Sequence, residues 1–208
     1  MILLALEFSS DRRSVALARG GEILAEAVQQ TESRATDALG LIEKVLTQGK
    51  VLREDIEVVA VGLGPGSYTG IRAAIAVAQG WQLARGVKLL GVSSVAAMAA
   101  QAQAEKIFGR VNVVVDAQRG EFYLGTWEVS ADRRVELVPL KIVPAVEIEA
   151  LKNAGDVCVG PERSQLFPVA SAVARLATGR DDFIAGEQLT PVYLRETTFL
   201  KSAPARVV

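Results

Sequence analysis

The residues with the clearest chemical potential form one glycine-rich segment, residues 62–72, which reads Gly-Leu-Gly-Pro-Gly-Ser-Tyr-Thr-Gly-Ile-Arg. The segment lies between an apolar run and a helical pattern, so backbone N–H groups and the positive end of a helix dipole would meet there, as they do in phosphate sites. The two common nucleotide motifs do not fit it. A P-loop needs Lys-Ser or Lys-Thr after its second glycine, and the segment has no lysine. A GxGxxG motif fails because Ser67 or Thr69 stands at its third glycine.

The other interpretation of this segment is a tight structural turn from a strand into a helix. Gly64, Gly66 and Gly70 are the positions where a positive φ or a close approach of two backbones is expected. Ser67 or Thr69 can cap the helix that follows. We predict that the turn is structural and that it sets the start of this helix.

Two acids, Glu7 and Asp116, end short apolar runs at corresponding positions of what looks like a repeat. In actin-like ATPases such a pair holds Mg²⁺ and a nucleophilic water between two lobes. Here Phe8 replaces the small residue that would let a phosphate approach the backbone. Glu7 and Asp116 are therefore candidates for a vestigial site, and the alternative is two solvated acids that pair with Arg12 or Arg119.

The composition excludes several kinds of catalysis. The chain has no histidine, and Cys158 is its only cysteine, so Ser-His-Asp and Cys-His arrangements and metal sites built on these residues are excluded. We expect no metal and no tightly bound cofactor. A net charge of −1 gives no field that would hold nucleic acid or a membrane.

Two further features indicate a cytoplasmic protein. The N-terminus places its charges after the apolar stretch, whereas an export signal has the reverse order. The longest uncharged run, residues 89–104, has 16 residues and is shorter than the roughly 18 that a membrane span needs.

Hydrophobic periodicity and turn residues predict the order of elements along the chain. Strands are expected over residues 2–6, 14–18, 23–28, 58–63, 87–92, 111–115, 122–129, 135–143 and 157–159, and helices over 35–46, 69–84, 94–104, 144–152 and 164–177. Three strands followed by helix, strand and helix occur twice. The pattern predicts an α/β protein made of a duplicated ribonuclease-H-like unit, the two-lobed actin-like ATPase fold. We expect lobes at residues 1–106 and 107–208, with an irregular tail from Glu196.

The helix expected over residues 69–84 has two apolar sides. Ile71, Ala74, Ile75, Ala78 and Gln82 form one stripe, and a second lies about 200° away by the rule of 100° per residue. The second stripe consists of Ala73, Ala76, Val77, Gly80 and Ala84. It must bury against another element, either within this chain or on a protein partner, and its small residues allow a close approach.

Three segments resemble the bacterial TsaB (YeaZ) family of tRNA threonylcarbamoyladenosine synthesis. Residues 64–72 look like the signature GPGS[FY]TG[LIV]R, residues 116–123 are similar to a DARxxEVY segment, and residues 191–195 match P-x-YLR. The first signature is highly specific and the other two are supportive. The resemblance covers about residues 1–195.

The resemblance implies a subunit that assembles rather than catalyses. In this family the paralogue TsaD carries metal-binding histidines and the nucleotide site, TsaB pairs with it, and the ATPase TsaE joins them. ATP and metal are then expected on the partners, and tRNA only through the complex. Family members meet through two helices that are similar to residues 34–46 and 69–84, so the expected interface includes Ala35, Leu39, Ile42 and the second stripe. A homodimer is also possible.

The chain departs from the family in two places. It begins LLALEFSS where members commonly have ILAIDTST, so Glu7 and Phe8 move it further from a phosphate site. The usual HSExLLPxI is replaced at residues 34–42, which lose the His, Ser, Glu and Pro. That segment borders the expected interface. Either the partner has changed to match this segment, or this chain pairs with lower affinity or with itself.

Two alternative functions come from the enzyme class. An ATP-dependent phosphotransferase or hydrolase of the sugar-kinase type would use Glu7 and Asp116. A metallopeptidase is disfavoured because the chain has no histidine and no HExxH-like constellation.

Overall fold

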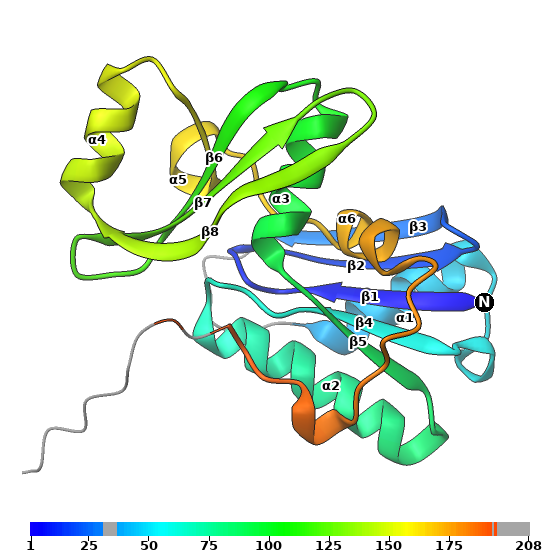
Figure 1. Ribbon diagram of the computed structural model, residues 1–208. Helices are drawn as coiled ribbons and strands as arrows, with labels where there is room; N and C mark the ends of the chain where they lie inside the picture. The colour runs from blue at the N-terminus through cyan, green and yellow to red at the C-terminus, as the bar shows by residue number, and fades with distance from the viewer. Residues whose placement is uncertain (31–36, 193, 195–208) are drawn as a thin grey trace, which may run out of the picture.

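The chain forms two β-sheets with helices packed on them, shown in Figure 1 for the computed structural model, which describes residues 1–30, 37–192 and 194. The first sheet has five strands in the order β3-β2-β1-β4-β5. These strands are β1 (Ile2–Glu7), β2 (Arg12–Arg19), β3 (Glu22–Gln30), β4 (Val58–Gly62) and β5 (Lys88–Val92). β1 pairs antiparallel with β2 and parallel with β4, so β1 lies in the middle and ends beside the start of the glycine-rich turn.

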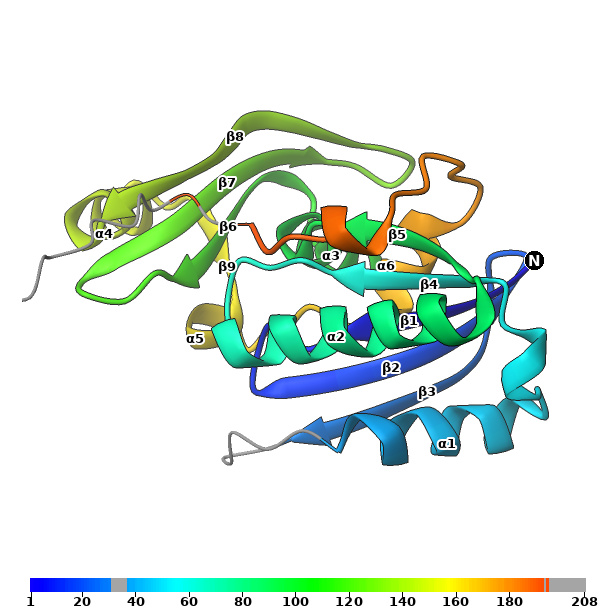
Figure 2. The same ribbon diagram turned by 90° about the horizontal axis from the view of Figure 1, so that it is seen from below.

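Helices α1 (Ala38–Gly49) and α2 (Tyr68–Arg85) cover one face of this sheet, as Figure 2 shows from below. Side chains alternate along β1, and its even-numbered residues point to this face. They form a core with one stripe from each helix: Leu4, Leu6 and Phe8 with Leu41, Ile42, Val45, Ile71, Ala74, Ile75 and Ala78. A 3-10 turn, η1 (Arg53–Asp55), follows α1.

Helices α3 (Ser94–Ala104) and α6 (Ala170–Ala177) lie on the opposite face. Leu3, Ala5, Ala16 and Ala18 of the sheet pack there against Ala97 of α3 and the buried side of α6. α3 also packs on the second sheet, where Val95 and Met98 contact Val111, Val113 and Trp127. One helix therefore joins the two sheets.

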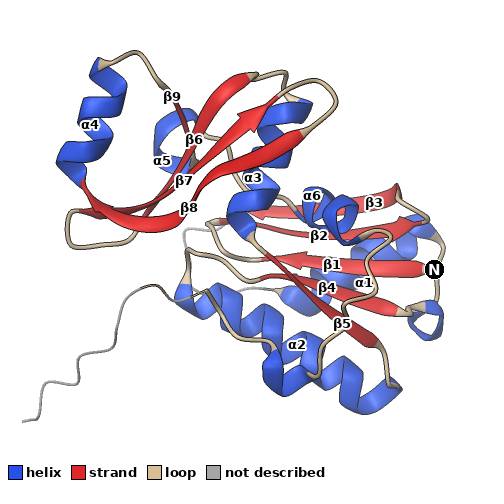
Figure 3. Cartoon of the chain, in the orientation of Figure 1, coloured by secondary structure: helices blue, strands red, loops and turns tan. Residues whose placement is uncertain are grey.

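The second sheet has the order β8-β7-β6-β9. Its strands are β6 (Gly109–Asp116), β7 (Glu121–Val129), β8 (Arg134–Pro144) and β9 (Val157–Val159), and α4 (Ala145–Asn153) and α5 (Pro161–Ser164) follow β8 and β9 (Figure 3). β6 pairs antiparallel with β7 and parallel with β9, which repeats the pairing of β1 with β2 and β4. The repeated connectivity confirms the predicted duplication of a ribonuclease-H-like unit.

The C-terminal part of the chain differs from its sequence prediction. Of the single helix expected over residues 164–177, only residues 170–177 form a continuous helix, α6, while the short helix α5 ends at Ser164 and an irregular stretch lies between them. Pro168 lies in this stretch, and a proline has no N–H to donate and disfavours helical geometry at the residue before it. After it, α6 returns to the first sheet, although residues 107–208 were expected to form one lobe. A short 3-10 turn, η2 (Gly186–Gln188), lies beside α2 and completes the described elements.

Among residues 1–30, 37–192 and 194, no helix is long and apolar enough to cross a membrane. The irregular tail expected from Glu196 lies outside the described residues.

Candidate functional site

The glycine-rich turn connects β4 to α2 in a strained backbone conformation. Gly64 has φ +85° and Gly66 has φ +145°, values that residues with a Cβ rarely adopt. Ser67 is the N-cap of α2, and its Oγ accepts a hydrogen bond from the Gly70 N–H over 3.3 Å. Thr69, the other candidate cap, is an exposed residue inside the first turn.

Two N–H groups of this turn donate to Ser9 and Ser94, which lie far from the turn in sequence. The Ser67 N–H donates to the carbonyl oxygen of Ser9 over 2.7 Å, and the Gly64 N–H donates to Ser94 Oγ over 3.0 Å. A Cβ on Gly66 would lie 2.1 Å from the Ser9 carbonyl oxygen, and one on Gly70 would lie 2.0 Å from that of Phe8. The turn therefore packs directly on the end of β1.

Glu7 is fully buried at the end of β1, next to this turn. The Ser9 N–H donates to its Oε1 over 2.8 Å, and the Ser94 hydroxyl donates to its Oε2 over 2.7 Å. Gly62 leaves the room for the carboxyl, since a Cβ there would lie 2.0 Å from Oε2. Burial raises the pKa of Glu7, and the hydrogen bonds from Ser9 and Ser94 oppose this rise in part.

Asp116 lies at the corresponding end of β6 and makes the same local turn. The Gln118 N–H donates to its Oδ1 over 2.7 Å, as the Ser9 N–H does to Glu7, and Gln118 Nε2 donates to its Oδ2 over 2.9 Å. The partners predicted for these two acids were arginines, and this prediction was wrong for Glu7, whose hydrogen bonds come from Ser9 and Ser94.

Burial and the hydrogen bonds from Ser9 and Ser94 set the pKa of Glu7, without a contribution from Asp116. Asp116 instead influences Glu162 at the start of α5, whose pKa is raised by burial, then by the charges of Asp116 and Asp11. Across the described part of the chain, no group of three or more acids or cysteines is arranged to hold a metal ion.

The second stripe of α2 faces outward. Ala76, Gly80 and Ala84 are exposed and Ala73 is half-buried, whereas Val77, which was also expected at the interface, packs partly against the core under α2. On the same side, the Leu83 side chain is 89% exposed. This helix therefore presents a flat face of small residues with one large apolar side chain near its C-terminal end, while its Ile71 and Ile75 stripe fills the core.

The α1 part of the expected interface needs one correction. Ile42 is 2% exposed and belongs to the core. Together with Leu41, it lies on the side of α1 that faces the sheet. Leu39 is 67% exposed, as an interface residue requires, and Ala35 lies outside the described residues.

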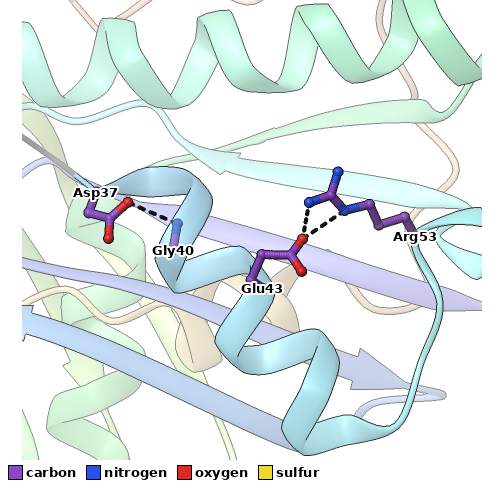
Figure 4. A network of polar contacts seen from close by, with 4 residues as sticks. All are labelled: Asp37, Gly40, Glu43 and Arg53. Atoms are coloured by element: carbon purple, nitrogen blue, oxygen red, sulfur yellow. Dashed lines mark hydrogen bonds and ion pairs between the residues drawn. The ribbon is translucent and has the colours of Figure 1, made fainter.

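Polar contacts hold the start and the middle of α1 (Figure 4). Asp37 caps the N-terminus by accepting from the Gly40 N–H over 2.9 Å, and Arg53 of η1 pairs with Glu43 in the middle of the helix. Leu39 lies between Asp37 and Glu43 in sequence, on the exposed side of α1.

Two residues of the buried network were missed by sequence reasoning. Ser94 is one of them: it follows Ser93, the cap of α3, and donates to Glu7. Gly62 was read only as the first residue of the glycine-rich segment. The sequence did offer one signal for Gly62: it directly follows four apolar strand residues, and a glycine in a strand often marks a place where another group approaches the backbone closely.

Part of the C-terminal motif is visible beside this site. The Val192 N–H donates to the Leu63 carbonyl oxygen over 2.9 Å, which places Pro191 and Val192 against the glycine-rich turn. Tyr193 and Arg195 of the motif lie outside the described residues.

The repeated unit, with its two strand-end acids and its strand-to-helix turn, defines a two-lobed protein of the actin-like ATPase class. A family model described as "TsaD: tRNA N6-adenosine threonylcarbamoyltransferase" matches residues 22–172. The chain belongs to this family, and within it to the TsaB (YeaZ) group.

Individual relatives agree with this placement. The chain is 27% identical to the tRNA threonylcarbamoyladenosine biosynthesis protein TsaB of Escherichia coli, over 99% of this chain and 100% of that one. It is 26% identical to the protein of the same name from Bacillus subtilis, over 74% of this chain and 67% of the other. Among solved structures, YeaZ from Pseudomonas aeruginosa superposes with a TM-score of 0.79 at 26% identity and covers 93% of this chain and 99% of that one.

Proposed function

We propose that the chain is a non-catalytic subunit of the complex that forms threonylcarbamoyladenosine in tRNA next to the anticodon. In this proposal it binds a TsaD-type catalytic paralogue, a TsaE-type ATPase joins the pair, and tRNA is contacted only through the complex. Membership of the TsaB group supports the pathway, because its named relatives are tRNA threonylcarbamoyladenosine biosynthesis proteins.

The exposed face of α2 is the observation that carries the proposed binding role. Ala76, Gly80 and Ala84 form a flat strip on which a second helix can pack at short distance. Exposed Leu83 adds a large apolar side chain to this face, and exposed Leu39 lies on the neighbouring helix α1, so a partner that covered them would remove both from water. We propose that the TsaD-type subunit covers this face, and that a second copy of the chain covers it when that subunit is absent.

The glycine-rich turn supports the non-catalytic part of the proposal. The N–H groups of Ser67 and Gly64 donate to Ser9 and Ser94, and Phe8 is fully buried. The chain has no histidine that could bind metal or transfer a proton. In the proposal ATP and metal therefore bind to the partner subunits, and this chain holds neither tightly.

The test compares two arginine variants in reconstitution with TsaD and TsaE homologues. Gly80→Arg puts a long charged side chain in the centre of the α2 face, and Ala131→Arg puts one on an exposed turn of the second sheet. We expect Gly80→Arg to stay folded by circular dichroism and to lose both co-purification with TsaD and threonylcarbamoyl transfer to tRNA. Ala131→Arg should retain both.

Two results would contradict the proposal. A Gly80→Arg variant that still binds TsaD would place the interface elsewhere. ATP hydrolysis by the purified chain alone, lost on Asp116→Ala, would favour the phosphotransferase or hydrolase alternative, since that reaction needs a carboxylate at this position.

A further inference from the structure

The Glu7 carboxyl is buried more completely than a structural acid normally is, and it has few partners. A buried carboxylate usually accepts several hydrogen bonds or pairs with a cation. Glu7 accepts hydrogen bonds from the Ser9 N–H and the Ser94 hydroxyl, the Ser9 side chain also lowers its pKa, and within the described residues no cation pairs with it. The site therefore suits a neutral carboxylic acid better than an anion.

The charged groups around Glu7 do not compensate for its burial. On the same face of the first sheet, β2 carries Arg12, which stacks at 6.0 Å over the ring of Phe167, and β3 carries Glu26, which accepts from the Ser171 N–H. Arg13 lies on the opposite face because side chains alternate along β2.

The other elements packed against the carboxyl bring no charge. β4 contributes Gly62, α3 contributes Ser94, and the glycine-rich turn from residue 63 to 67 has no ionisable side chain. Asp11, in the turn after β1, is exposed and acts on Glu162.

The contacts of Glu7 join three parts of the fold. Its own strand lies in the centre of the first sheet, and Ser94 begins α3, the helix that joins the two sheets. Ser94 Oγ also accepts from the Gly64 N–H of the turn that starts α2. We propose that neutral Glu7 is a pH-sensitive latch, which ties α3 and the glycine-rich turn to β1 and loosens this junction when it ionises.

The reason is the balance between hydration and hydrogen bonding. In the neutral form, Glu7 donates its proton to Ser94 Oγ across the 2.7 Å contact, whereas in the ionised form the Ser94 hydroxyl donates to Glu7 Oε2. Ionisation puts a charge on a fully buried carboxyl, and the chain can relieve this by opening the junction. The inference concerns the chain alone and does not depend on the proposed function.

The sign of the pH effect follows from the raised pKa of Glu7. Folding favours the protonated carboxyl, so the stability it contributes is fully present below the ordinary pKa of 4.5 and is lost as the pH rises through the raised pKa. The Glu7→Gln variant keeps the shape and cannot ionise. A matched control is Glu128→Gln, which removes a carboxyl from an exposed position of β7.

The experiment measures urea unfolding of the full chain from pH 4.5 to 8. We expect the unfolding constant of Glu7→Gln to match wild type near pH 4.5 and to become smaller than wild type at higher pH, by about tenfold for each unit by which folding raises the pKa. Glu128→Gln should follow wild type throughout. A Glu7→Gln curve parallel to wild type overturns the proposal.

A second measurement does not depend on the folding of any variant. The ¹³C signal of the Glu7 carboxyl in the wild-type chain should titrate with a midpoint above 4.5, and exchange of the Gly64 amide hydrogen should accelerate above that midpoint by more than base catalysis alone causes. A midpoint at or below 4.5, or Gly64 exchange that shows no added acceleration, overturns the latch.

Discussion

The backbone N–H of Ser67 donates to the carbonyl oxygen of Ser9 over 2.7 Å, so the cap of α2 is fastened directly to the end of β1. The Ser67 side-chain Oγ also accepts a hydrogen bond from the Gly70 N–H in the first turn of α2. One residue therefore fixes both the position and the start of the helix whose outer face we propose as the partner surface.

Gly66→Val should destabilise the chain and weaken complex formation together. The backbone there has φ +145°, and a Cβ would lie 2.1 Å from the Ser9 carbonyl oxygen, so the turn must move away from β1. Strain of this kind costs about 2 to 4 kcal/mol of folding free energy, which thermal unfolding will show as a lower Tm.

The control for Gly66 is Gly80→Ala. A Cβ on Gly80 meets nothing within 4 Å, and alanine favours a helix over glycine, so the folded chain should gain about 0.5 to 1 kcal/mol. If Gly66→Val kept its Tm but lost a nucleotide that wild type binds, the turn would be a ligand site.

Ile75→Ala and Leu83→Ala should separate the two sides of α2. Ile75 is 6% exposed in the core, and its truncation should cost about 2 to 4 kcal/mol of unfolding free energy in urea. Leu83 is 89% exposed, so its truncation should change stability by less than about 0.5 kcal/mol while weakening binding of the TsaD homologue. Equal losses of stability in the two variants would show that Leu83 is covered within the chain.

Glu162 provides a pH prediction at the contact between the sheets. Its pKa is raised first by burial and then by the charges of Asp116 and Asp11, so the stability it contributes is present below 4.5 and is lost as the pH rises through the raised pKa. Asp116→Asn removes one of these charges and should move the ¹³C titration of the Glu162 carboxyl to lower pH. A titration that does not move would show that burial alone raises this pKa.

The local elements were predictable because their signals are local. Ser67 and Gly86 bound α2 as a helix cap and a helix stop do, and short apolar runs predicted most of β1 and the central residues of β2. The amphipathic period of α1 was also clear. Because residues 38–46 carry apolar side chains over a broad arc of the helix, the sequence alone did not decide whether Ile42 lies on the core side or the exposed side.

The contacts that the sequence did not reveal are long-range. Glu7 and Ser94 are 87 positions apart, and neither residue type predicts the other. The return of α6 to the first sheet depends on similar contacts, since the Ser14 hydroxyl accepts the Ala170 N–H over 2.8 Å across 156 positions. The sequence pattern shows which side of a helix is apolar. It does not show which of the two sheets that side will cover.

This return leads to a prediction about fragments. A fragment of residues 1–106 contains the whole first sheet but lacks α6, so Leu3, Ala5, Ala16 and Ala18 would lose the helix that covers them. The Ser14 hydroxyl would also lose its partner. We expect this fragment to bind a hydrophobic dye and to unfold without a cooperative transition.

Joining residues 165–192 to it through a flexible Gly-Ser linker should restore cooperative unfolding by circular dichroism, because the added segment supplies α6 and the Ile184 pairing with Leu89. The matched control carries Val173→Asp in the added segment, which puts a charge into the buried side of α6 and should prevent the rescue. Cooperative unfolding of the 1–106 fragment alone would show that the first sheet is complete without the C-terminal helix.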